Sequence, residues 1–111
     1  MGYWPKVLVP SFAQGADLIT FGGEVLNLAP PGRHTSTQMG TGHFSREGFR
    51  KASFFKKVQV IKAQTPNTYV SPEKTRVNIE RPKCYDLEVG KNLKGNWGYF
   101  FFYGGPGGSC T

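Results

Sequence analysis

Alternating apolar and polar positions in the C-terminal half of the chain predict antiparallel β-strands. The segments 75–80 and 85–89 both alternate residue by residue, which places one face of each strand on a core and the other in water. The residues expected to face inward are Val77, Ile79, Tyr85, Leu87 and Val89. Residues 97–103 are apolar on both faces, so we expect that strand to lie in the centre of its sheet.

Two other segments have the composition of strands. Residues 18–28 form an apolar run that Gly22 and Gly23 interrupt, and residues 52–62 form a second run rich in Phe, Val and Ile. Residues 7–18 have room for one or two helical turns, and no longer helix is expected. Short apolar runs closed by Gly, Pro, Asn or Ser are typical of antiparallel sheets.

We therefore expect an all-β fold, an antiparallel β-sandwich of jelly-roll type. A sandwich needs two sheets that cover one another, because strands without a partner sheet leave open edges. A chain of 111 residues is short for a complete large sandwich, so we expect it to form the C-terminal part of one.

The composition is that of one ordered domain. The chain contains 15 Gly and 8 Pro, which excludes a mostly helical bundle, and its 14% aromatic content argues against disorder. No run of about 18 apolar residues is present, so we expect no membrane partner. The first residues lack the charged and then apolar pattern of a signal peptide.

The net charge of +7 raises the question of nucleic-acid binding. Basic and aromatic residues interleave between positions 44 and 62, as single-strand binding platforms require. However, Lys56 and Lys57 are adjacent and would face opposite sides of a strand, and no RRM or KH motif is present. We therefore expect no nucleic-acid partner and favour a basic secreted protein.

Metal and cofactor sites have little support. Cys84 and Cys110 form no CxxC pair, and they fit either one disulfide or two unrelated buried thiols. His34 and His43 share a loop that has no Cys or carboxylate at ligand spacing, and the Gly-rich loops lack the lysine and helix of a phosphate loop. We expect no metal and no cofactor.

Glu24 is the one carboxylate whose local sequence suggests a cleft. In an extended segment it shares a face with Gly22, whose missing side chain leaves open space beside the carboxyl group. Ile19, Phe21 and Val25 occupy the opposite face, which is the better core candidate. The alternative is a solvated glutamate on an outer surface.

Six motifs in a fixed order resemble a known family. They are Gly2-Tyr3-Trp4-Pro5, Phe21-Gly22-Gly23-Glu24-Val25, residues 34–44 (HTSTQMGTGHF), residues 48–52 (GFRKA), Cys84-Tyr85-Asp86 and residues 97–107 (WGYFFFYGGPG). The series is similar to the C-terminal half of the plant neprosin domain, the prolyl glutamic endopeptidase family. On this resemblance, residues 1–111 are the C-terminal portion of a neprosin-type peptidase domain.

The resemblance implies a secreted β-sandwich with a cleft across one sheet, acting in acid on peptides after proline. The family uses two glutamates, of which one lies in the Gly-Gly-Glu motif and matches Glu24. The other belongs to the N-terminal half, which this chain lacks. We therefore expect a proline-containing peptide or protein as substrate, the N-terminal half as a partner, and no activity from this chain alone. Among its other acids, Glu47 in the motif loop is the only plausible substitute.

The resemblance also suggests roles for other residues. Gln38, His43 and Tyr103 are polar members of family motifs and are candidates for lining the cleft. Cys84 and Cys110 match a family disulfide. The alternative to a peptidase is a non-catalytic secreted β-sandwich: a pseudoenzyme, or a module that binds cell-wall material or carbohydrate.

Overall fold

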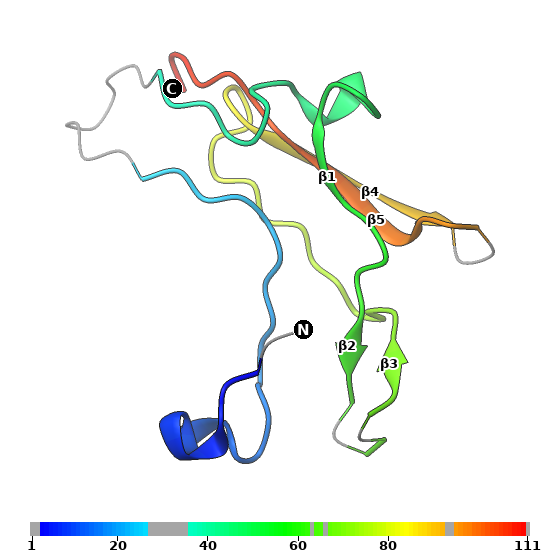
Figure 1. Cartoon of the computed structure of the whole chain (residues 1–111). Helices are drawn as coiled ribbons and strands as arrows, with labels where there is room; N and C mark the ends of the chain where they lie inside the picture. Colours follow the sequence, from blue (N-terminus) through cyan, green and yellow to red (C-terminus); the bar gives the residue numbers. More distant parts are fainter. Residues whose placement is uncertain (1–2, 27–35, 63, 66, 93–94, 111) are drawn as a thin grey trace.

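The computed structural model describes residues 3–26, 36–62, 64–65, 67–92 and 95–110 (Figure 1). Its elements in chain order are η1 (Lys6–Leu8), η2 (Pro10–Phe12), η3 (Ser45–Glu47), β1 (Ser53–Phe55), β2 (Val60–Ile61), β3 (Tyr69–Val70), β4 (Asp86–Asn92) and β5 (Gly98–Gly104). All strand pairs are antiparallel, and the helical elements of the described residues are short 3-10 turns. The expectation of an all-β fold is confirmed. None of these turns is long and apolar enough to cross a membrane.

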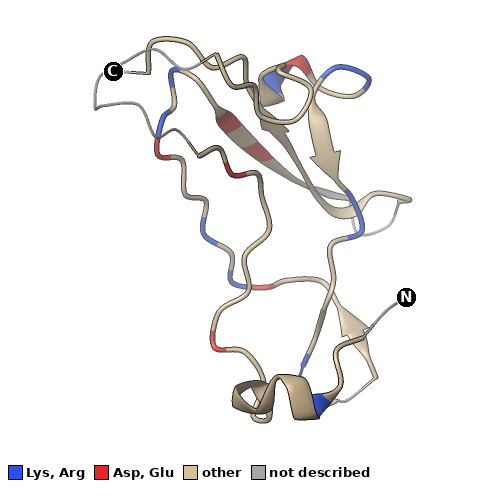
Figure 2. Ribbon diagram, turned by 60° about the vertical axis from the view of Figure 1, so that its left-hand side comes forward, with Lys and Arg blue, Asp and Glu red and all other residues tan. Residues whose placement is uncertain are grey.

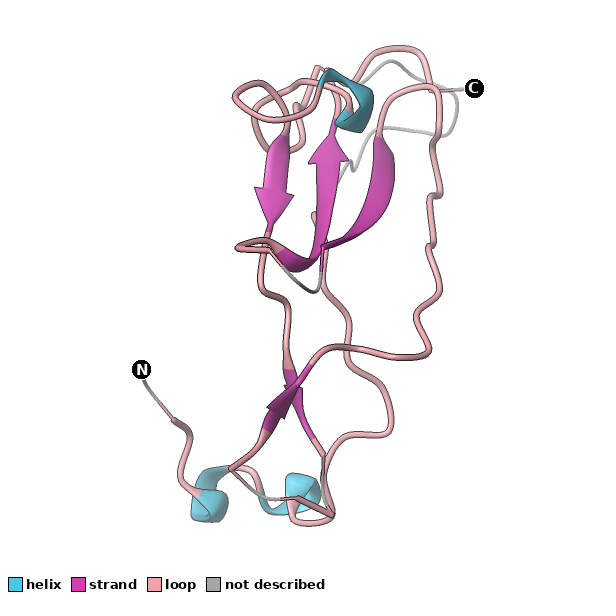
Figure 3. Cartoon of the chain, turned by 90° about the vertical axis from the view of Figure 1, so that its right-hand side faces the viewer, coloured by secondary structure: helices cyan, strands magenta, loops and turns pink. Residues whose placement is uncertain are grey.

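The main sheet has three strands in the order β1-β5-β4, with β5 in the centre (Figure 3). β5 pairs with β4 along its whole length and with β1 at its C-terminal end. One face of the sheet carries the core, a cluster of Val58, Tyr99 and Phe101. Leu87, Val89 and Tyr103 pack against that cluster. The prediction that the strand with two apolar faces is central is confirmed.

The predicted strand at 52–62 is two strands in two sheets. β1 ends at Phe55, and Lys57 then adopts a left-handed backbone with φ of 54°. A left-handed residue cannot continue a pleated strand, so the chain turns there. The backbone N–H of Lys57 donates to the carbonyl of Trp97 at 2.8 Å, and β2 goes on to pair with β3 in a separate two-stranded sheet.

The predicted strands at 18–28 and 75–80 are not formed in the described residues. Both segments are extended but join neither sheet, since no strand of the described residues pairs with them. Their apolar side chains stay in solvent: Ile19 and Val77 are each 51% exposed. The two sheets lie end to end rather than face to face (Figures 1 and 3). The all-β class is therefore established, and the sandwich stays a prediction.

A disulfide ties the C-terminal coil to the main sheet. Cys84 and Cys110 are bonded with their Cα atoms 5.3 Å apart, and Cys84 is fully buried. Of the two sequence alternatives, the disulfide that the family resemblance implied is present. Gly105 lies against this corner, where a Cβ would collide with the Cys84 carbonyl, and it exchanges backbone hydrogen bonds with Met39. The motif loop is therefore fastened to the end of β5.

Candidate active site

An open cavity of about 1170 Å³ lies between the core face of the main sheet and two extended segments. Residues 16–25 and residues 72–81 line the cavity together with side chains of the sheet. These segments run apart from the sheet in both views (Figures 1 and 3). Of the residues that the sequence selected for the site, Glu24 and Tyr103 both line this cavity. Gln38 and His43 are not among its lining residues.

Glu24 is held near the sheet through its neighbour Gly23. A Cβ on Gly23 would come within 2.8 Å of the Met39 side chain and of the Tyr103 ring, so the backbone touches both. Gly22 has no atom within 4 Å of the position of its missing Cβ. The sequence-based expectation of open space beside the carboxyl group of Glu24 therefore agrees with the structure. Glu24 itself is exposed, so a substrate can reach it.

The ring of Tyr103 is a fixed part of the cavity wall. Tyr103 lies in β5 between Ser53 of β1 and Leu87 of β4. Its ring packs against the rings of Phe55, at 5.4 Å between centroids, and Phe101, at 5.8 Å. Because Tyr103 is clamped in the central strand, it is a firm support for the Gly23 backbone.

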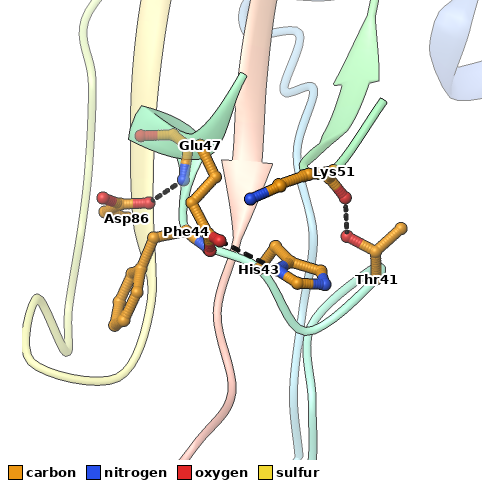
Figure 4. Close-up of polar contacts among 7 residues, drawn as sticks. Thr41, His43, Phe44, Glu47, Lys51 and Asp86 are labelled. Atoms are coloured by element: carbon orange, nitrogen blue, oxygen red, sulfur yellow. Dashed lines mark hydrogen bonds and ion pairs between the residues drawn. The ribbon is translucent and has the colours of Figure 1, made fainter. Parts of the chain in front are cut away.

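His43 belongs to a hydrogen-bonded turn instead of the cavity (Figure 4). Its Nδ1 lies 3.0 Å from Glu47 Oε1, and the backbone N–H of Phe44 donates to Glu47 Oε2 at 3.0 Å. The hydrogen bond from His43 and the one from Phe44 hold the pKa of Glu47 below its usual value. Glu47 therefore stabilises the η3 turn through its side chain. Like His43, it is not among the residues that line the cavity with Glu24.

Asp86 makes contacts with η3 that could not be predicted from the sequence. The backbone N–H of Ser45 donates to Asp86 Oδ1 at 2.5 Å, and Arg46 Nη1 lies 3.9 Å from Asp86 Oδ2. Ser45 is buried, so this bond satisfies an N–H that water cannot reach. The alternation of the strand placed Asp86 on a polar face but gave no sign of a partner 41 residues away.

Gln38 folds back on its own loop. Its amide group lies where a Cβ of Gly42 would be, with Cδ at 2.6 Å from that position. The same turn is fixed by Thr41, whose backbone N–H donates to Ser53 Oγ at 2.9 Å. The hydroxyl of Thr41 donates to the Lys51 carbonyl at 2.6 Å (Figure 4). Gln38 therefore shapes the motif loop beside β1.

No group of three or more potential metal-binding side chains gathers within the part of the chain that the structure describes. His34, the partner considered for His43, lies outside the described residues.

A known protein family matches nearly the whole length of the chain. The model of the Neprosin family matches residues 1–106, a span that includes Glu24, the motif loop and the Gly-rich end of β5. No solved structure matches the chain. The family and the disulfide are both compatible with an extracellular protein. The sequence motifs, the all-β fold and the family match lead to one conclusion: this chain belongs to the neprosin family of peptidases.

Proposed function

We propose that this chain carries one half of the active site of a secreted glutamic endopeptidase that cleaves after proline in acid. Glu24 is the catalytic carboxyl group in this proposal. The observation that carries it is the placement of the Gly22-Gly23-Glu24 segment, with Gly23 resting on Met39 and Tyr103 and open space at Gly22. The open space at Gly22 leaves room for a substrate to approach the segment that carries Glu24.

Two carboxyl groups can together hydrolyse a peptide bond. One is ionised and takes a proton from the attacking water, while the other is protonated and donates to the developing oxyanion. Close carboxyl groups push their titrations apart, and the resulting pKa values belong to the pair. An acidic working range follows, since one member must keep its proton. Glu24 supplies one of these groups.

The second carboxyl group comes from the N-terminal half of the domain in this proposal. Two of the carboxylates that line the same cavity as Glu24 have other partners: Glu73 pairs with Lys62 at 2.7 Å, and Asp86 pairs with Ser45 and Arg46. The Lys62 hydrogen bond also holds the pKa of Glu73 below its usual value, which does not suit a group that must carry a proton. The exposed apolar segments that line the cavity are where such a half would pack.

The test compares three proteins on a proline-containing peptide in acid: this chain, the same chain joined to its N-terminal half, and the joined protein carrying Glu24→Gln. Glutamine keeps the shape of glutamate but cannot ionise. We expect no activity from the chain alone and a loss of about a hundredfold or more in kcat in the variant, the usual contribution of a general acid or base.

Glu80→Gln in the joined protein is the matched control, because Glu80 is also exposed and lines the same cavity. It should leave kcat unchanged. Full activity in the Glu24→Gln protein, or activity from this chain alone, would overturn the assignment. A joined protein that folds but hydrolyses no peptide would favour the non-catalytic alternative.

A further inference from the structure

The face of the main sheet opposite the core carries a continuous group of aromatic rings. Phe54 of β1 pairs with Phe102 of β5, and Phe100 lies two residues before Phe102 on the same side. Phe49 and Trp97 approach this side from the flanking loops. We call the group the aromatic face, and its members are Phe49, Phe54, Trp97, Phe100 and Phe102.

Trp97 is the centre of the aromatic face. Its ring centroid lies 5.0 to 5.8 Å from those of the other four rings. The group is nevertheless open to solvent, since Phe49 is 57% exposed and Phe54 is 39% exposed. Contiguous exposed apolar surface of this kind marks a site of interaction more often than chance exposure does.

Lys and Arg residues flank β1 in the chain (Figure 2). Lys56 Nζ lies 5.6 Å above the ring of Trp97. Arg50 precedes β1 in the chain and Lys57 follows it. Both have a left-handed backbone, with φ of 76° and 54°. That conformation is unfavourable for residues other than glycine, and residues held in it cluster at functional sites. Within the described residues, neither Arg50, Lys56 nor Lys57 forms an ion pair with a carboxylate.

We propose that the aromatic face binds an acidic polysaccharide, a chain of uronic acid residues. The C–H faces of sugar rings pack on the electron-rich faces of aromatic rings, and their carboxylates pair with Lys and Arg at the border. The disulfide is compatible with an oxidising, extracellular compartment, where a polysaccharide is a more accessible polyanion than a nucleic acid. This inference is independent of the proposed catalysis.

Two other occupants fit the aromatic face less well. Successive nucleic-acid bases are parallel and need a series of parallel ring faces, whereas these rings meet one another at 44° to 87°. A sugar residue can instead pack on one exposed ring, such as Phe49 or Phe54. A second copy of the chain would bring two strongly basic surfaces together, since each carries a net charge of +7.

Charge also predicts where on the aromatic face the polysaccharide lies. Glu88 of β4 pairs with Phe102, so its carboxylate stands on this face at the edge away from β1. A polyanion is repelled there and attracted by Arg50, Lys56 and Lys57. The sugar chain should therefore follow the β1 edge, across Phe54 and Trp97.

The test uses the whole chain with Trp4→Phe, which leaves Trp97 as its only indole. Polygalacturonate is added while Trp97 fluorescence is followed, with dextran as the neutral polymer and oligo(dT) as the nucleic acid. We expect a saturable change with polygalacturonate that weakens at high salt, because salt screens exposed charges. Lys56→Gln should weaken binding by about threefold and Glu88→Gln should strengthen it by a similar factor, as exposed charge pairs typically do.

Matched variants separate this site from general charge and folding effects. Lys6→Gln removes one positive charge in η1 and should leave binding near that of the parent. Phe49→Ala should weaken binding, whereas Phe12→Ala, at a comparably exposed ring in η2, should not. Near-ultraviolet circular dichroism checks that the variants stay folded. An equal response to dextran, tighter binding of oligo(dT), a fluorescence change that depends on protein concentration without ligand, or equal effects of Lys56→Gln and Lys6→Gln would each overturn the proposal.

Discussion

Gly22 and Gly23 are neighbours in one motif, but the structure gives them different roles. A Cβ on Gly23 would press within 2.8 Å of Met39 and Tyr103, and one on Gly22 would meet nothing within 4 Å. Gly23→Ala should therefore detach residues 18–26 from the sheet, at a cost of about 1 to 3 kcal/mol in local packing. Gly22→Ala should be close to neutral.

Amide hydrogen exchange across residues 18–26 measures this difference. Exchange should speed up in Gly23→Ala and stay near the parent rate in Gly22→Ala. Equal exchange in the two variants would show that the contact with Met39 and Tyr103 does not hold the segment that carries Glu24.

The turn at η3 should weaken in acid. The hydrogen bonds from His43 and Phe44 favour the ionised form of Glu47, so its pKa in the folded protein lies below the ordinary value of 4.5. Glu47 therefore adds stability above pH 4.5 and loses it as pH falls toward the lower folded pKa. The difference in melting temperature between the parent and Glu47→Gln should shrink over that range.

Melting curves from neutral pH down to strongly acidic pH provide the measurement. Glu80→Gln is the control, since Glu80 is exposed and has none of the hydrogen bonds that Glu47 makes. A difference between parent and Glu47→Gln that stays constant across the acidic range would contradict the predicted loss.

At the scale of elements, a strand is predicted correctly from the sequence where the same chain supplies the neighbouring strand that pairs with it. β5 has apolar residues on both faces and two neighbouring strands, and it forms where expected. Residues 75–80 alternate as cleanly but pair with no strand in the described part of the chain. The break in 52–62 depends on a left-handed Lys57, which residue type does not signal, because lysine rarely adopts that conformation.

In the candidate site too, some features could be predicted from the sequence and others depend on the fold. The Gly-Gly-Glu motif and Tyr103 could be chosen from the sequence because they belong to family motifs, and the structure places both at one cavity. Met39 beneath Gly23, and the bond from Ser45 to Asp86, depend on how distant segments meet in the fold. Local alternation carries no information about such contacts.

The whole molecule has more surface than a compact protein of its size. It exposes 9034 Å², whereas a compact protein of 12.3 kDa exposes about 6,100 Å². Its radius of gyration is 16.7 Å, against about 13 Å expected for a compact chain of this length. The excess of about 2,900 Å² is larger than one partner's share of a typical obligate interface, which is about 1,000 to 2,500 Å². Much of the exposed apolar surface lies on the segments beside the cavity, such as Leu18, Ile19 and Val77.

The N-terminal half that we propose, joined or as a separate chain, should therefore stabilise this chain. Burial of the apolar segments would raise the melting temperature by roughly 4 to 8 °C for each kcal/mol gained, and binding of an apolar dye should fall. Small-angle scattering and thermal melts of the chain with and without that half measure the effect. The contrary result would be a lone chain that unfolds cooperatively as a monomer, with a radius of gyration near that of a compact domain. Such a chain would have no need of a partner to cover Ile19 and Val77, and the second carboxyl group would then have to be sought within its own sequence.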